Sequence, residues 1–161
     1  MSLILRPTTE NDLPFVFEIE RKAADERFVT SETIESHKRY LNDSDIRHFI
    51  IEADEKAVGY AILAGLNDKN ENIEFRRMVV AEKGKGFGRK SLQLIKNIAF
   101  EELNAHRLWL DVKDFNERAR KLYESENFTT EGIWREAGKA KNGQRESLVF
   151  MSILRSEYST K

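Results

Sequence analysis

The longest amphipathic segment of the chain, residues 86–103, places the strongest limit on its architecture. Apolar side chains recur there every three or four positions, and Leu94 and Ile98 widen the stripe that they form. The stripe itself consists of Leu92, Ile95, Ala99 and Leu103. This spacing predicts a helix with one buried face. Strand-like segments precede and follow it, so the helix stands at the centre of the predicted fold.

The remaining segments complete a mixed architecture. Strands are expected over about 3–6, 48–52, 57–66, 73–80, 107–112, 129–139 and 144–154, and further helices over about 9–24, 31–41 and 116–127. Asn142-Gly143 joins the last two strands as a hairpin turn. The order predicts an α/β (α+β) fold with a mixed, mostly antiparallel sheet of six or seven strands and about four helices.

Composition excludes several classes of protein. The 161 residues fit a single domain, 1–161, and the 27 Lys+Arg against 28 Asp+Glu argue against a nucleic-acid binder. No apolar run approaches the ~18 residues of a membrane span, and the first residues do not resemble a signal peptide. The chain has no cysteine, which rules out disulfides, thiolate metal sites and a cysteine nucleophile. A cytoplasmic protein is expected.

A basic, glycine-rich segment stands where a strand ends and the long helix begins. Residues 83–90 contain three glycines and four positive charges. Glycines allow a ligand to approach the backbone, and a helix N-terminus attracts anions, so the segment predicts a phosphate or pyrophosphate site. It matches neither the P-loop pattern nor the dinucleotide fingerprint, because Arg89 and Ser91 replace the required glycines. A flexible, solvated connector is the alternative.

A second motif lies in residues 110–128. An expected strand is followed by Asn116, by Ala119 three positions later, by the pair Leu122-Tyr123, and by a helix that ends before Phe128. This motif resembles motif B of the GNAT superfamily of N-acetyltransferases, and Lys83 to Gly88 resembles motif A of that superfamily. The resemblance covers Leu3 to Leu154. It is strongest to the branch that includes spermidine and ribosomal-protein N-terminal acetyltransferases.

The sequence departs from the family pattern at three positions. Lys83 stands in place of Gln or Arg, Glu82 replaces a proline, and Asn127 replaces the glycine that ends the helix. Asparagine is the next-best residue for a left-handed helix end. None of these changes removes the predicted anion site.

The resemblance implies where acetyl-CoA would bind. Its cleft would open as a V-shaped splay between two central parallel strands, residues 73–80 and 107–112. The pantetheine arm would pair with the backbone of Met78, Val79 and Val80 and would accept a hydrogen bond from Asn116. The pyrophosphate would rest on the segment made of Lys83, Gly84, Lys85, Gly86, Phe87, Gly88 and Arg89.

The resemblance also implies the reaction, a direct transfer of acetyl from the thioester to a primary amine. Glu74 would take the proton that the amine must lose, and Tyr123 would protonate the leaving thiolate. The plainer alternatives are a core position for Tyr123, a pairing of Glu74 with Arg76 or Arg77, and a helix cap for Asn116. No metal site is expected, because the three histidines are isolated in the sequence.

The sequence leaves the acceptor open. Residues 1–46 hold ten acidic and six basic residues. In the family this region covers the acceptor side, so its negative charge favours a cationic amine, such as a polyamine or a basic protein N-terminus. Exposed helix faces explain the same charges more simply. A non-catalytic acyl-CoA-binding domain is the alternative function, and the choice among monomer, homodimer and higher homo-oligomer is also open.

Overall fold

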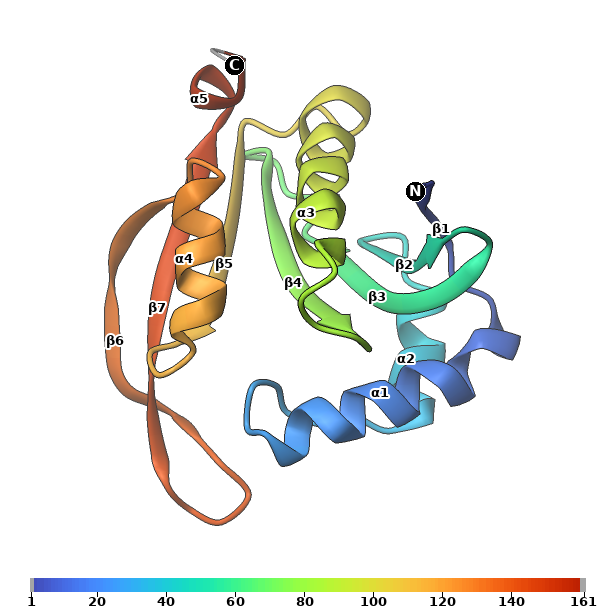
Figure 1. The fold of residues 1–161 in the computed structure, drawn as a ribbon. Helices are drawn as coiled ribbons and strands as arrows, with labels where there is room; N and C mark the ends of the chain where they lie inside the picture. Colours follow the sequence, from blue (N-terminus) through green and yellow to red (C-terminus); the bar gives the residue numbers. More distant parts are fainter. Residues whose placement is uncertain (1, 160–161) are drawn as a thin grey trace.

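The computed structural model describes residues 2–159, which build one seven-stranded sheet (Figure 1). The strands are β1 Leu3–Pro7, β2 Ile46–Ala53, β3 Lys56–Ala64, β4 Asn72–Val80, β5 Arg107–Lys113, β6 Thr129–Lys139 and β7 Arg145–Leu154. Their order in space is β1-β2-β3-β4-β5-β7-β6. Neighbours pair antiparallel except β4 and β5, which run parallel. The predicted mixed, mostly antiparallel sheet is confirmed.

Five α-helices within residues 2–159 flank the sheet. They are α1 Leu13–Asp25, α2 Ile34–Leu41, α3 Phe87–Asn97, α4 Glu117–Ser125 and α5 Arg155–Ser159. A 3-10 turn at Glu10–Asp12 precedes α1, and Pro14 occupies the first turn of α1, where its missing N–H costs no hydrogen bond. Four of the five helices correspond to predicted ones. The short helix α5 carries no amphipathic pattern and was not predicted.

The longest predicted helix is interrupted. Its regular α-helical part ends at Asn97, and Ile98–Glu102 forms a wider π-helical turn. That turn buries Ala99 and Phe100 completely. The continuous helix expected over 86–103 was therefore wrong in its last turn, although the buried stripe is real.

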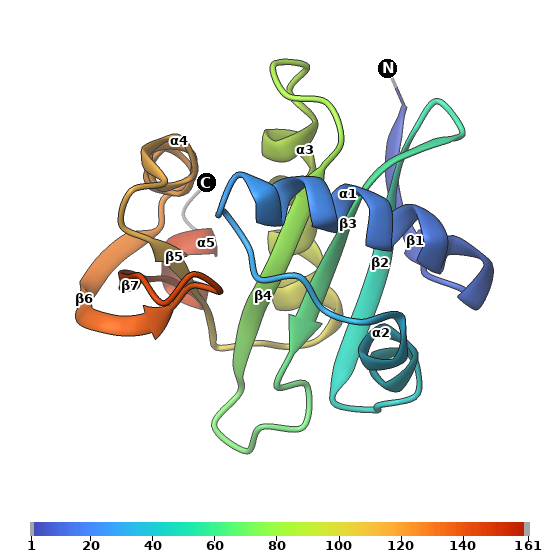
Figure 2. The same ribbon diagram turned by 90° about the horizontal axis from the view of Figure 1, so that it is seen from below.

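Two layers of helices cover opposite faces of the sheet. Leu13, Val16 and Ile19 of α1 pack against Ile50 and other side chains on one face. Side chains of α3 and α4 pack on the other face, against Phe49, Phe75 and the inward side chains of β5. Figure 2 shows α1 lying across the strands on one side and α3 on the other. Alternate residues of each strand therefore serve two separate cores.

The sheet opens in its middle. The parallel pairing of β4 with β5 consists of Asn72 with Arg107, Ile73 with Leu108, and Glu74 with Trp109. Beyond these pairs the two strands separate, as Figure 1 shows. The V-shaped splay that the resemblance implied is present.

A β-bulge in β4 lies beside the splay. On β3, Ile62 faces Arg77 and Leu63 faces Phe75, so Arg76 has no partner opposite it. A bulge of this kind bends a strand and increases its local twist. The bend therefore begins where β4 leaves β5.

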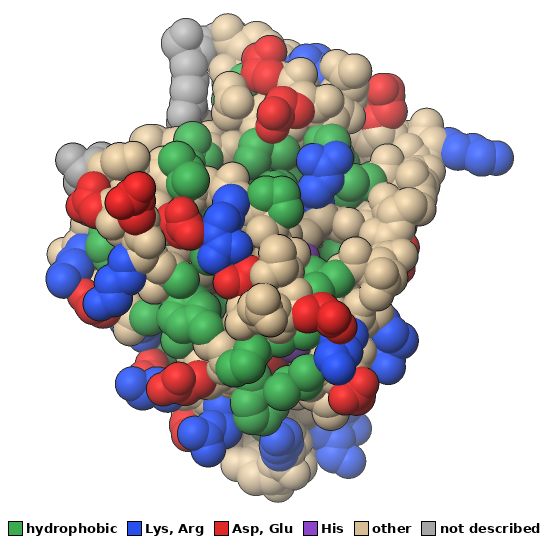
Figure 3. All heavy atoms as spheres, turned by 90° about the vertical axis from the view of Figure 1, so that its right-hand side faces the viewer, with side chains coloured by type: hydrophobic (Ala, Val, Ile, Leu, Met, Phe, Trp, Pro, Cys, Tyr) green, Lys and Arg blue, Asp and Glu red, His purple; other side chains and the backbone are tan. Residues whose placement is uncertain are grey.

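The surface carries both signs of charge. Figure 3 shows Lys and Arg interspersed with Asp and Glu and with hydrophobic side chains over one side of the molecule. This distribution accords with the formal net charge of -1. Within residues 2–159, no helix is both long enough and apolar enough to cross a membrane.

Candidate active site

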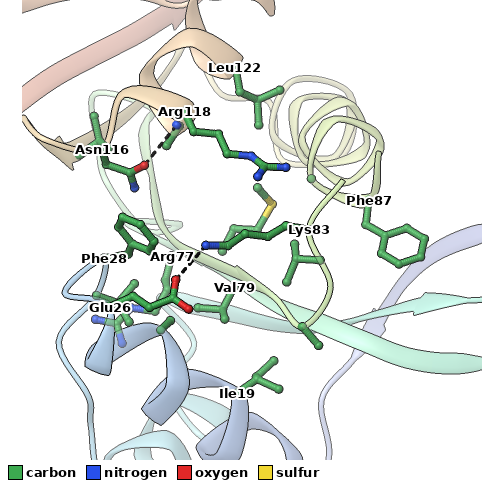
Figure 4. A pocket seen from close by; sticks show the side chains of 18 of the residues that line it. Ile19, Glu26, Phe28, Arg77, Val79, Lys83, Phe87, Asn116, Arg118 and Leu122 are labelled. Atoms are coloured by element: carbon green, nitrogen blue, oxygen red, sulfur yellow. Dashed lines mark hydrogen bonds and ion pairs between the residues drawn. The ribbon is translucent and has the colours of Figure 1, made fainter. Parts of the chain in front are cut away.

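A cleft of about 1400 Å³ occupies the splay between β4 and β5. Its walls come from α1 and the segment that follows it, from β4, from the glycine-rich loop, and from β5, α4 and β7. Figure 4 shows side chains from these elements pointing toward one another across the opening. Residues far apart in the sequence thus share one site.

The edge of β4 offers unpaired backbone groups to this cleft. The amide of Ala81 donates to the carbonyl of Val58 on β3 at 2.7 Å, which sets the phase of the antiparallel ladder. Val79 therefore exchanges its hydrogen bonds with β3. Its neighbours Met78 and Val80 direct N–H and C=O toward the side from which β5 has departed. Of the three residues predicted to pair with pantetheine, two thus have backbone groups facing the cleft, and Val79 lines it without them.

The glycine-rich loop presents bare amides. Among the described residues, the N–H groups of residues 83–89 donate no hydrogen bond to the protein. Gly84 and Gly86 have φ values of 82° and 78°, and no atom lies within 4 Å of the position that a Cβ would take at either. Such a left-handed backbone favours glycine. The loop and the first turn of α3 therefore form a cradle of unpaired amides, a geometry that suits an anion, and anion binding there stays a prediction.

Three of the four basic side chains of residues 83–90 have protein partners. Lys83 Nζ is 3.0 Å from a carboxylate oxygen of Glu26 on α1 and 4.4 Å from the centre of the Phe28 ring. Figure 4 shows Lys83 reaching across the cleft to Glu26. Arg89 is tied to α4 through Ser125 and Glu126, at 2.9 and 2.8 Å. An anion in the cradle would meet backbone amides first and would compete with Glu26 for Lys83.

The cleft gathers most of the residues that the sequence singled out. Eleven line it: Met78, Val79, Val80, Lys83, Gly84, Gly86, Phe87, Gly88, Arg89, Asn116 and Tyr123. Two others, Lys85 and Glu74, do not line it. Lys85 pairs with Glu82 at the surface instead.

Asn116 and Tyr123 approach the cleft from α4. The Oδ1 atom of Asn116 caps this helix by accepting from the amide of Ala119 at 3.3 Å, so only its NH₂ group is left for a ligand. Tyr123 packs its ring edge-on against Phe75, with centroids 6.3 Å apart. Within residues 2–159 the Tyr123 hydroxyl makes no hydrogen bond. Burial and the charge of Asp111 raise the pKa of this phenol to about 12, so it is protonated at neutral pH.

Asp111 was missed by the sequence reasoning. It lies on β5 and lines the cleft, and no described residue forms an ion pair with it. Reduced solvation, with the nearby charge of Glu74, raises the pKa of its carboxyl. Glu74 itself is bound to Arg76 at 3.0 Å, as the plainer alternative expected. The available signal was the charge among the alternating leucines of β5, a single carboxylate on the face away from the core.

Arg118 is a second residue that the sequence reasoning left out. It extends from α4 into the cleft in Figure 4 and lines it. No ion pair within residues 2–159 engages its guanidinium. It adds positive charge opposite the glycine-rich loop.

A buried polar chain lies behind the α1 wall of the cleft. Glu20, fully buried on α1, accepts from Arg77 at 2.6 Å and from the Tyr60 hydroxyl, and it contacts His37 at 3.1 Å. His37 in turn contacts His48 at 3.1 Å. Burial opposes ionisation of Glu20, but hydrogen bonds led by those from His37 and Tyr60 lower its pKa to about 2. The chain keeps a buried carboxylate charged.

This buried chain makes stability sensitive to acid. Burial, reinforced by His37, lowers the pKa of His48 from 6.5 to about 4. A lowered folded-state pKa contributes stability that is present above pH 6.5 and is lost as the pH falls toward 4. We expect the free energy of unfolding, measured with urea, to fall by up to about 1.4 kcal/mol per pH unit across that range.

Two variants test whether His48 causes this dependence of the free energy of unfolding on pH. His48→Gln should flatten it, whereas His106→Gln, which alters an exposed histidine, should leave it unchanged. An equal slope in His48→Gln and the wild type would show that His48 is not its source.

Comparisons with known proteins agree with this geometry. A profile described as the acetyltransferase (GNAT) family matches residues 13–128. The chain belongs to this family. The spermidine N(1)-acetyltransferase of Escherichia coli K12 is 27% identical over 165 aligned positions, which cover 98% of this chain and 88% of the relative. Its Vibrio cholerae counterpart is 28% identical, over 97% and 95% of the two chains.

A solved structure extends the likeness to the whole fold. The spermidine N-acetyltransferase from Vibrio cholerae in complex with CoA and spermine has a TM-score of 0.87 and 28% identity, covering 98% of each chain. The resemblance to the spermidine branch is confirmed. The GNAT protein described here is an acetyl-CoA-dependent N-acetyltransferase that acts on a primary amine. This activity argues against the alternative of a non-catalytic acyl-CoA-binding domain.

Proposed function

We propose that the acceptor is an aliphatic polyamine, which loses one proton to Asp111 before the acetyl group is transferred. Two cleft-lining carboxylates, Asp111 and Glu18, have no ion-pair partner among the described residues, whereas Glu26 and Glu146 are neutralised by cations. An acceptor with several ammonium groups matches two open carboxylates. The unpaired Asp111 is the observation that carries the proposal, and the polyamine named in the Vibrio cholerae complex supports it.

The proton transfer follows from ordinary acidities. A primary alkyl amine has a pKa near ~10.4, so it arrives as an ammonium and cannot attack until it is deprotonated. A carboxylate with a raised pKa is the better proton acceptor. In this scheme Glu74 does not touch the amine but raises the pKa of Asp111, which revises the direct role first predicted for Glu74.

The acetyl transfer uses groups on both sides of the splay. The free amine attacks the thioester carbonyl, and a β4 amide from Met78 or Val80 stabilises the oxygen as it gains charge. The carbon–sulfur bond then breaks. Tyr123 hydrogen-bonds to the departing sulfur and supplies its proton, and the second proton that the nitrogen loses as the amide forms restores the phenol.

The cofactor would lie along the β4 edge and the loop. Pantetheine would pair with Met78 and Val80 and accept from the NH₂ of Asn116, and the pyrophosphate would bind the amides of residues 83–89. Lys83 would exchange Glu26 for a phosphate. The proposal also places the enzyme in the cytoplasm and includes self-association into a homo-oligomer.

An acceptor screen tests the acceptor and the base together. Spermidine, spermine, putrescine, free amino acids and N-terminal peptides are compared by release of CoA from acetyl-CoA. We expect polyamines to give the highest kcat/KM. Asp111→Asn should lower that value about tenfold to a hundredfold, the worth of one charge-assisted hydrogen bond, while Glu74→Gln costs less.

The matched control is Asp114→Asn, which alters an exposed aspartate that does not line the cleft. It should retain full activity. Faster turnover of peptides than of polyamines would contradict the acceptor class. A larger loss in Glu74→Gln than in Asp111→Asn would return the base role to Glu74.

A further inference from the structure

The five residues after α1, Glu26–Thr30, form a strap across the open end of the splay. In Figure 1 this segment lies below the separated ends of β4 and β5. Four of its five members, Glu26, Phe28, Val29 and Thr30, line the cleft. The strap therefore closes the acceptor half of the site on one side.

Polar contacts attach the strap to three parts of the molecule: to β5 and β7, to the glycine-rich loop, and to β4. These parts lie on both sides of the gap between β4 and β5. Arg27 pairs with the buried Glu146 of β7 at 3.0 Å, and Lys113 of β5 donates to the Arg27 carbonyl at 2.8 Å. Glu26 meets Lys83 of the glycine-rich loop. Among the described residues, the hydrogen-bonded attachment to β4 is one side chain, Arg77, which donates to the Thr30 carbonyl at 2.8 Å, while Val29 packs in the apolar cluster that contains Val79.

Arg77 is itself held from behind. The same Nη1 atom that reaches Thr30 lies 2.6 Å from Glu20, whose carboxylate is fully buried. Glu20 is fixed from other directions by the Tyr60 hydroxyl and by the amide of Glu32 at 2.9 Å. A guanidinium clamped between a buried anion and a carbonyl has little freedom, since its planar donors fix the directions of the bonds.

This clamp joins the acceptor wall to the strand that would carry the thioester. Arg77 directly precedes Met78, whose backbone faces the cleft, and directly follows the bulge at Arg76. Arg77 thus makes the hydrogen bond that sets the spacing between the strap and β4. Approach of two reactants is sensitive to displacements of about 1 Å.

We propose that Arg77 is a positioning residue for the acceptor: held by Glu20, it fixes the strap at the distance from β4 at which the amine meets the thioester. This rests on the proposed function only in using the acceptor half of the cleft. It predicts that Arg77 governs acceptor use and strap mobility while leaving the cofactor cradle untouched.

The test compares Arg77→Met with Arg47→Met, which removes an exposed arginine from β2. We expect Arg77→Met to raise the acceptor KM at least tenfold and to speed amide hydrogen exchange over residues 26–32. The Kd for CoA should stay within twofold of the wild-type value. Arg47→Met should match the wild type in all three, and Arg77→Lys should be intermediate.

A further variant separates positioning from unfolding. Arg77→Met leaves a buried carboxylate unpaired, so the double variant Glu20→Gln/Arg77→Met removes both charges and should show the same raised KM with a folded core. Unchanged acceptor KM, unchanged strap exchange, or an equal loss of CoA affinity would overturn the proposal. If the wild type acetylates no polyamine, the proposed acceptor is wrong, and strap exchange in these variants alone decides the role of Arg77.

Discussion

Replacing Tyr123 with phenylalanine is expected to lower kcat about a hundredfold while leaving CoA affinity unchanged. The ring remains between Phe75 and Phe128, with centroid distances of 6.3 and 5.7 Å, so the packing of α4 is retained. Only the hydroxyl is lost, and it has no protein partner in the described part of the chain. General-acid catalysis contributes about a hundredfold or more. The measurements are steady-state kinetics at saturating acetyl-CoA and calorimetric titration with CoA.

The pH profile gives this prediction a second readout. The pKa of Tyr123 in the folded protein is about 12, so the phenol keeps its proton up to pH 10. Below pH 10, deprotonation of Tyr123 should therefore cause no decrease in kcat. Any decrease seen in that range should also be present in Tyr123→Phe. Tyr158→Phe is the control, because Tyr158 stacks on Phe100 away from the cleft. A full kcat in Tyr123→Phe would remove the phenol from the chemistry.

A valine at Gly86 should raise the Kd for CoA about a hundredfold. At φ 78° a β-branched residue is strained by about 1–3 kcal/mol. The loop is therefore expected to shift, and its amides no longer point toward the pyrophosphate. Each hydrogen bond to a charged group is worth about 1.5–3 kcal/mol, and a loss near 3 kcal/mol in total corresponds to about two powers of ten. Calorimetry with CoA measures the effect directly.

Gly132→Val is the matched control. Gly132 lies on β6 in open space and does not have a positive φ, so valine is tolerated there. Gly132→Val should unfold close to the wild type, and Gly86→Val should lose no more than the about 1–3 kcal/mol of backbone strain, because the loop at Gly86 is exposed. Equal CoA affinity in Gly86→Val and Gly132→Val would mean that the cradle does not hold the pyrophosphate.

Local signals in the sequence were sufficient for the strands, four helices and the position of the glycine-rich loop. Amphipathic spacing revealed α3, and Asn142-Gly143 marked the final hairpin, where Gly143 has φ 86°. The glycines and charges of residues 83–90 could be read as a predicted phosphate site because they are contiguous. The π-helical turn after Asn97 was not predicted, because the same apolar stripe is compatible with regular and widened helical turns.

The missed residues depend on partners distant in the chain. Glu20 looked like one more carboxylate on a helix, and its role appears only when Arg77, 57 positions away, is folded against it. His37 and His48 seemed isolated for the same reason. Asp111 differs, because the alternation of β5 already indicated its side of the strand, but not that it would lack a cationic neighbour.

The three residue pairs that join β4 to β5 all lie at one end of these strands, so the sheet consists of two halves connected at that end. Within each half, every strand is paired with its neighbour along its length. Among the described residues, backbone pairing between the halves is limited to Asn72–Glu74 with Arg107–Trp109. A change in the width of the gap between β4 and β5 beyond these pairs would break no strand-to-strand hydrogen bonds within either half. Backbone pairing between the halves is thus confined to one end of the gap, and side chains make the remaining contacts across it, among them Phe75 with Tyr123 and Arg89 with Glu126.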